Sequence, residues 1–125
     1  MPLQSIQDPI WVHEVHNPGS NRLDARFVAD LFGVTLTELA SWTDISYETL
    51  KKSPDSVSAQ RSLQQLVHSW EILMTVFPDY ATIRNWLHHP IRRLRGRTPL
   101  WLLQQEDGVN SFEGLAEEFV DPTTD

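Results

Sequence analysis

The sequence predicts an all-α fold, a compact multi-helix domain built around one core. Apolar residues recur three and four positions apart along most of the chain, which is the spacing of one helix face. The apolar stretches are separated by Ser, Thr, Asp, Pro and Gly, the residues that begin and end helices. No stretch alternates apolar and polar residues as a half-buried strand does. The chain has 125 residues, 40% of them hydrophobic, enough for one core but not for a deep cleft between lobes.

The N-terminal part of the chain predicts an extended arm followed by a helix. Residues 1–21 are interrupted by prolines and show no helical spacing. Helical spacing begins near Arg22, and Gly33 is a natural end for that helix. His13 and His16 stand three positions apart, but neither a helix nor a third ligand is evident there, so we expect no metal.

Two short helices are expected next. Thr35 or Thr37 precedes Glu38, a capping arrangement for the first of them. Ser46 is the expected N-cap of the second, which ends near Lys52.

The longest helix is expected to begin at Ser56 or Ser58 and to stop at Phe77-Pro78, because proline cannot continue a helix. Its apolar residues recur at helical spacing: Leu63, Leu66, Val67, Trp70, Leu73, Met74 and Phe77. This is more apolar surface than one small core needs, which makes a homodimer plausible.

The rest of the chain predicts three more helices. Asp79 is the expected N-cap of the first, which ends before Pro90. Thr98 followed by proline marks the start of the second. Gly108 separates this helix from a final one that runs through Phe119. The residues expected in the core of this part are Trp86, Leu87, Pro99, Leu100 and Leu103.

Residues 36–52 have the layout of a helix-turn-helix. Ala40 is small enough to let the two helices approach, and Ile45 and Leu50 would fix the angle between them. In such a motif the second helix enters the DNA major groove by its N-terminal end. The candidate DNA-binding residues are Ser46, Tyr47 and Glu48 toward bases, and Lys51 and Lys52 toward phosphates. Glu48 opposes phosphate, and Asp44 stands where the tight turn usually has glycine, so a plain scaffold role stays open.

Charge is distributed unevenly along the chain. The net charge of −7 argues against a general nucleic-acid coat. Residues 81–105 contain no Asp or Glu, and their basic residues are Arg84, Arg92, Arg93, Arg95 and Arg97. Residues 106–125 carry acidic charges only. Two surfaces for two different partners would explain this pattern, and so would two faces that pair with one another.

Several function classes are disfavoured. The absence of cysteine excludes disulfides and thiolate metal sites. No catalytic triad or dyad, glycine-rich phosphate loop or metal-ligand spacing is evident, so we expect neither enzyme activity nor a cofactor. His68, His88 and His89 have no carboxylate partner by spacing and are expected at the surface. With no signal peptide and no apolar stretch near the roughly 20 residues that span a bilayer, we expect a cytoplasmic protein without a membrane partner.

The most specific pattern lies between Tyr80 and Phe119. A Trp-Leu pair and a proline are followed by Gly96-Arg97-Thr98-Pro99-Leu100, then by a Leu-Leu pair, an Asp-Gly step and a short final helix. This order of motifs resembles the toxin-binding domain of the Xre/MbcA/ParS antitoxins. The resemblance extends upstream and covers roughly residues 36–120, and its sharpest part is residues 96–100.

The resemblance implies a partner and a mechanism. Similar proteins pair with a RES-domain toxin, an enzyme that depletes NAD⁺, and cover its active site, often with their C-terminal end. The complex represses its own operon through the helix-turn-helix. The toxin's pocket is expected to bind the pyrophosphate of NAD⁺ through basic groups. The acidic C-terminal end of this chain could pair with those groups in place of the substrate. The candidate toxin-binding residues are Arg95, Arg97, Glu117, Glu118, Phe119, Val120 and Asp121.

The expected organisation follows these motifs. Residues 1–21 form an arm, 22–78 the Xre-like helix-turn-helix region with the long helix, 79–121 the toxin-binding domain and 122–125 a tail. The expected function is that of an antitoxin with a RES-domain toxin and operator DNA as partners. The alternative is a stand-alone helix-turn-helix regulator or adaptor without a toxin, because the second helix of the motif has only two lysines where family members usually carry several arginines.

Overall fold

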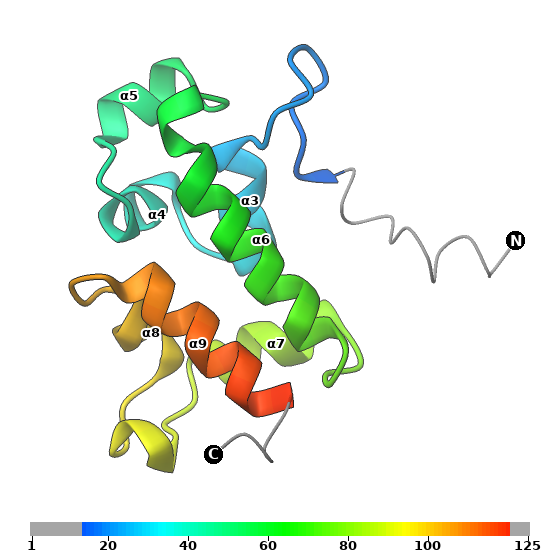
Figure 1. Cartoon of the computed structure of the whole chain (residues 1–125), viewed down its shortest axis with the longest axis vertical. Coiled ribbons are helices and arrows are strands. Elements are labelled where there is room, and N and C mark those ends of the chain that lie inside the picture. The colour runs from blue at the N-terminus through cyan, green and yellow to red at the C-terminus, as the bar shows by residue number, and fades with distance from the viewer. Residues whose placement is uncertain (1–13, 121–125) are drawn as a thin grey trace, which may run out of the picture.

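The fold is all-α, as predicted, and the computed structural model describes residues 14–120. Figure 1 shows α6 crossing the molecule, with α3, α4 and α5 around its first half and α7 at its end. The helices are α3 (Ala25–Phe32), α4 (Leu36–Trp42), α5 (Tyr47–Lys52), α6 (Gln60–Met74), α7 (Tyr80–Leu87), α8 (Pro99–Leu103) and α9 (Gly108–Val120). Two short 3₁₀ turns are η1 (Val57–Ala59) and η2 (Arg92–Leu94).

One hydrophobic core joins all of these helices, and α6 packs most extensively against α9. Phe32, Trp70 and Phe112 come from three different helices and are all buried at its centre. The centroid of the Phe32 ring lies 4.9 Å from that of the Trp70 ring and 6.1 Å from that of the Phe112 ring. The α6 residues Leu63, Leu66, Trp70 and Leu73 are likewise buried. The core of a single chain therefore already uses most of the apolar stripe that suggested a homodimer.

The helix boundaries follow local capping signals. Thr35 and Glu38 form a complete capping box at the start of α4. Gly33 adopts a left-handed backbone with a φ of 73° and ends α3. Side-chain caps at three further helix starts come from Ser46, Asp79 and Thr98, as predicted.

Three predicted features are wrong in detail. The first helix begins at Ala25 rather than near Arg22, because Asp24 caps it through a hydrogen bond from the Arg26 amide. The long helix ends at Met74, before the proline, because the chain tightens there into a turn. Leu100 is half-buried and packs against the core rather than lying within it, since the buried residues of the five-residue α8 are Pro99 and Leu103. Its buried face is completed by the residues at its two ends.

The described end of the N-terminal arm is folded back rather than extended. Val15 is buried, and its carbonyl accepts a hydrogen bond from the Asp24 amide at 2.8 Å. Burial alone would raise the pKa of the Asp24 carboxyl. Hydrogen bonds from Arg26 and Asn17 outweigh that effect and hold its pKa below the ordinary value. His13, of the predicted histidine pair, lies outside the described residues.

Candidate functional site

A rigid connection holds α9 against the rest of the C-terminal segment. Gly108 is buried at the first position of α9, where an added Cβ would lie 2.4 Å from the carbonyl oxygen of Leu103. It would also lie 2.5 Å from that of Leu102, so no residue with a side chain fits without moving α9 away from α8. The preceding Asp107 has a φ of 59°, which reverses the chain direction. The Asp-Gly step of the motif thus has a structural reason.

The Gly-Arg-Thr-Pro segment closes a small loop around η2. Arg97 and Ile91 form an isolated antiparallel bridge, with the Ile91 amide donating to the Arg97 carbonyl at 3.0 Å. The turn between them needs two left-handed residues, Arg95 with a φ of 59° and Gly96 with a φ of 86°. Because Gly96 has open space around it, its role is conformational rather than steric.

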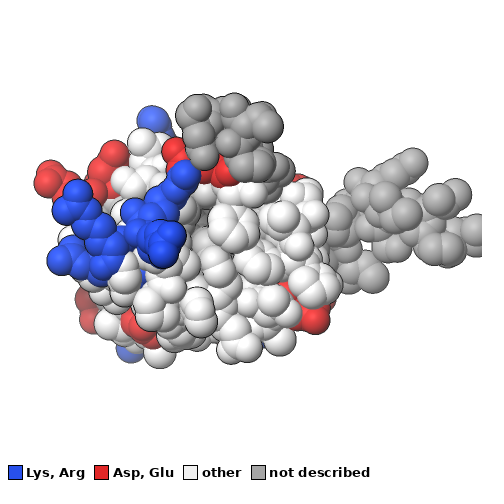
Figure 2. All heavy atoms as spheres, turned by 90° about the horizontal axis from the view of Figure 1, so that it is seen from below, with Lys and Arg blue, Asp and Glu red and all other residues white. Residues whose placement is uncertain are grey.

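The arginines of this loop are exposed at one end of the molecule. Figure 2 looks onto this end and shows basic side chains gathered on one side, beside a broad uncharged surface. Arg95 and Arg97 are both exposed, and the Arg97 guanidinium lies 4.4 Å from the centroid of the Trp101 ring. Arg84 does not join them, because it donates to the carbonyls of Asp30 and Leu31 at the end of α3.

The acidic end of α9 meets this arginine loop. Glu118 forms an ion pair with Arg93, so the two oppositely charged segments do pair with one another at this point. Glu117 and Glu118 are both exposed. The side chain of Val120 and the whole of Asp121 lie outside the described residues.

An aromatic cluster fixes the end of α9. Phe119 stacks on Phe77 with ring centroids 5.6 Å apart and lies 5.3 Å from Trp86. Phe119 nevertheless remains 42% exposed. Trp86 is in the core, as predicted from the sequence. Phe77 was predicted to lie on the apolar face of the long helix, but it follows the end of α6 and contacts Phe119.

The C-terminal segment resembles a known family of domains. Residues 73–111 match the family model of the antitoxin Xre/MbcA/ParS C-terminal toxin-binding domain. This segment is therefore similar to the toxin-binding domain of those antitoxins. The match runs from the end of α6 through α7, η2 and α8 into the first turn of α9. Curated proteins and solved structures gave no match to the chain.

The candidate helix-turn-helix consists of α4, α5 and the turn between them. In α4 and α5, Ala40 and Leu50 are buried and Ile45 is half-buried between them, as the motif requires. Asp44 does not have a positive φ, so glycine is not needed there. The Thr43 hydroxyl closes the turn instead, since it donates to the Ala40 carbonyl and accepts from the Ile45 amide, both at 3.0 Å.

The five candidate DNA-binding residues all lie at the surface of α5 or at its N-cap: Ser46, Tyr47, Glu48, Lys51 and Lys52. Lys51 extends over the Tyr47 ring, with its ammonium 5.9 Å from the ring centroid. Figure 1 shows α5 near one end of the long axis of the molecule and the end of α9 near the other. The two candidate surfaces are therefore well separated.

One contact between α6 and α9 was not predicted from the sequence. His68 was expected to have no carboxylate partner, yet its Nδ1 lies 2.8 Å from Glu113 Oε2. Spacing along the chain gave no signal for this pair, because α6 and α9 are distant in sequence and adjacent only in the fold. His68 is exposed, as predicted, and so are His88 and His89. Among the described residues, no helix has the length and apolar character needed to cross a membrane.

Proposed function

We propose that the chain is the antitoxin of a type II toxin–antitoxin system that neutralises a RES-domain, NAD⁺-depleting toxin. The observation that carries this proposal is the match of residues 73–111 to an antitoxin toxin-binding domain, which implies a toxin as partner. In this proposal the chain acts by binding rather than by catalysis, in the cytoplasm. The RES-domain identity of the toxin follows from the family resemblance of the sequence.

The geometry of the C-terminal end supports inhibition by covering an active site. Glu117 and Glu118 are exposed carboxylates on the last turns of α9, and Phe119 adds a half-exposed aromatic ring beside them. A toxin pocket that binds the NAD⁺ pyrophosphate needs basic groups, and these carboxylates would pair with them. The aromatic cluster under Phe119 orders the end of α9 before binding, which lowers the entropy lost on association. Arg95 and Arg97 would contact acidic groups at the rim.

Autorepression through α5 is the second part of the proposal. The candidate DNA-binding side chains are exposed, and the turn between α4 and α5 is closed without a glycine. Because α5 and the end of α9 lie at opposite ends of the molecule, one chain can contact operator and toxin together. A homodimer would place two copies of α5 on the two half-sites of a palindromic operator.

Co-expression with the protein encoded beside this chain tests the proposal. The full-length chain should restore growth and cellular NAD⁺ and should co-purify with the toxin. The Glu117→Gln/Glu118→Gln variant should protect poorly, since it removes both negative charges, including the one paired with Arg93, and keeps the shape of the side chains. This variant is preferable to a truncation, which would also remove the Phe119 contacts.

The matched control is the Lys51→Gln/Lys52→Gln variant, whose changes lie on α5. It should protect fully, because α5 is remote from the end of α9. Failure of the full-length chain to bind or to protect would reject the antitoxin proposal for that partner. A genome that encodes no toxin beside the chain, together with specific operator binding, would favour the stand-alone regulator.

A further inference from the structure

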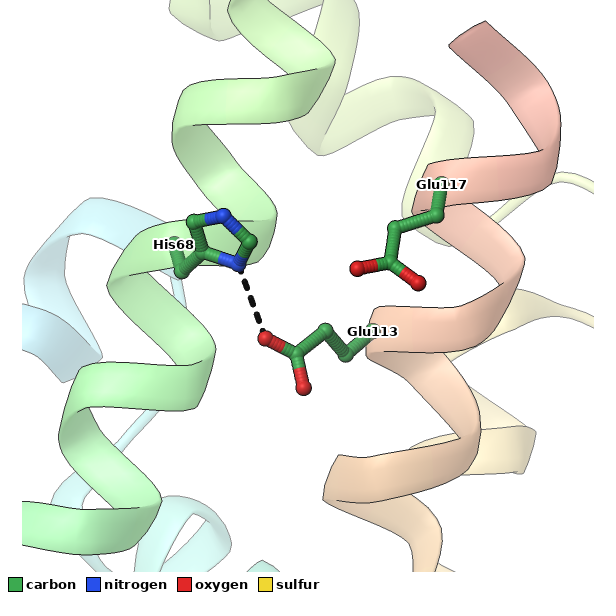
Figure 3. A group of neighbouring side chains, drawn as sticks. All are labelled: His68, Glu113 and Glu117. Carbon is green, nitrogen blue, oxygen red and sulfur yellow. Dashed lines mark hydrogen bonds and ion pairs between the residues drawn. The ribbon is translucent and has the colours of Figure 1, made fainter. Parts of the chain in front are cut away.

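Three side chains with metal-binding atoms converge on one point between α6 and α9. His68 lies on α6, and Glu113 and Glu117 lie one turn apart on the facing side of α9. Their candidate ligand atoms all lie within 4.8 Å of one another. Figure 3 shows both carboxylates directed toward the imidazole. A surface ion pair would account for His68 and Glu113, but it gives no reason for Glu117 to face the same point.

A neighbouring glutamine holds one of these carboxylates in place. Gln65 Nε2 donates to Glu113 Oε1 at 3.2 Å and to Asn110 Oδ1 at 3.1 Å. This contact orients the Glu113 carboxylate and leaves its Oε2 for His68, which is how outer-shell groups orient metal ligands. With a neutral imidazole the three ligands carry two negative charges, which a divalent cation would balance.

We propose that His68, Glu113 and Glu117 form a binding site for a divalent transition metal, with Zn²⁺ as the best-suited ion. Imidazole and carboxylate together favour zinc over magnesium or calcium, which prefer oxygen ligands alone. Zinc–ligand distances are about 2.0–2.2 Å, so the three side chains would rotate inward from the arrangement seen here, in which their ligand atoms lie within 4.8 Å of one another. The metal would replace the present contact between His68 Nδ1 and Glu113 Oε2, and water would complete the coordination.

Such a metal would join the two helices that form the largest packing interface of the fold. It would link the middle of α6 to the last turns of α9. The expected consequence is a chain that is more resistant to unfolding when zinc is bound, because only the folded state brings the three ligands together.

Calorimetric titration of Zn²⁺ into the metal-free, full-length chain tests this site. Saturable binding of one Zn²⁺ per chain is expected, with a rise in the thermal midpoint. His68→Gln, Glu113→Gln and Glu117→Gln should each weaken zinc affinity by at least about tenfold, since even outer-shell changes cost 10–100-fold. All three side chains are at least partly exposed, so the variants should fold, which circular dichroism checks.

The control is the His88→Gln/His89→Gln variant, which removes two exposed histidines outside the site and should leave the affinity unchanged. Absence of saturable binding in the full-length chain would overturn the proposal. An unchanged affinity in any one of the three ligand variants would overturn the three-ligand site. The titration uses the free chain, so its outcome is independent of toxin binding.

Discussion

Replacing Gly108 by alanine should destabilise the packing of α9 against α8. The added Cβ would lie 2.4 Å and 2.5 Å from two carbonyl oxygens of α8, well inside any observed contact distance. These are backbone atoms, so α9 must shift as a whole. Overpacking of this kind costs about 1–3 kcal/mol. The higher helix propensity of alanine offsets at most about 1 kcal/mol, and we expect a net loss of about 1–2 kcal/mol.

The matched control is Gly114→Ala in the same helix, where an added Cβ meets nothing within 4 Å. This variant should gain about 0.5–1 kcal/mol from helix propensity alone. Urea unfolding followed by circular dichroism measures both free energies of unfolding. Thermal midpoints should fall for Gly108→Ala and rise for Gly114→Ala, by about 3–6 °C per kcal/mol. A Gly108→Ala variant as stable as the wild type would refute the close approach of α8 and α9.

Three further predictions concern Asp24, Phe119 and the lysines of α5. Asp24→Asn keeps the helix cap but loses a buried charge, and should cost about 1–2 kcal/mol at pH 7. Because the folded pKa of Asp24 lies below its ordinary value of 3.8, the charge stabilises the wild type fully above about pH 5. That advantage is lost as the pH falls through the folded pKa of Asp24. The free energies of unfolding of the wild type and Asp24→Asn, measured from pH 7 to 2, should therefore become equal at the acidic end. Phe119→Ala should cost about 1–2 kcal/mol, less than a fully buried ring because Phe119 is 42% exposed; an unchanged stability would contradict the aromatic cluster. Lys51→Gln/Lys52→Gln should weaken operator binding and lower the salt slope of log K by about 2, measured by fluorescence anisotropy; an unchanged slope would remove α5 from the DNA interface.

The helix boundaries could be predicted because their signals are local. Thr35 with Glu38, Ser46 and Thr98 with Pro99 each satisfy backbone groups a few residues away, so the sequence alone identifies them. The end of α6 was misplaced because Pro78 shows only that the helix cannot continue past it, and a helix can end earlier. The chain leaves the helix at Met74, and Phe77 then contacts Trp86.

The contacts between distant segments could not be predicted from spacing. His68 with Glu113 and Arg93 with Glu118 join helices or loops that only the tertiary fold brings together. Arg84 was grouped with the other arginines by sequence, yet its guanidinium caps α3. Glu117 and Glu118 of the final helix lie at the surface, and their role in toxin binding is still a prediction.

The most direct test of the antitoxin proposal is inhibition of the purified toxin. NAD⁺ consumption by the toxin should be titrated with the full-length chain and with the Glu117→Gln/Glu118→Gln variant. We predict that the full-length chain abolishes NAD⁺ consumption near equimolar amounts. The variant should need at least about tenfold more, since each lost interfacial charge contact costs on the order of 2 kcal/mol or more. Continued NAD⁺ consumption in excess full-length chain would contradict neutralisation, and equal inhibition by the variant would contradict the role of the acidic end of α9.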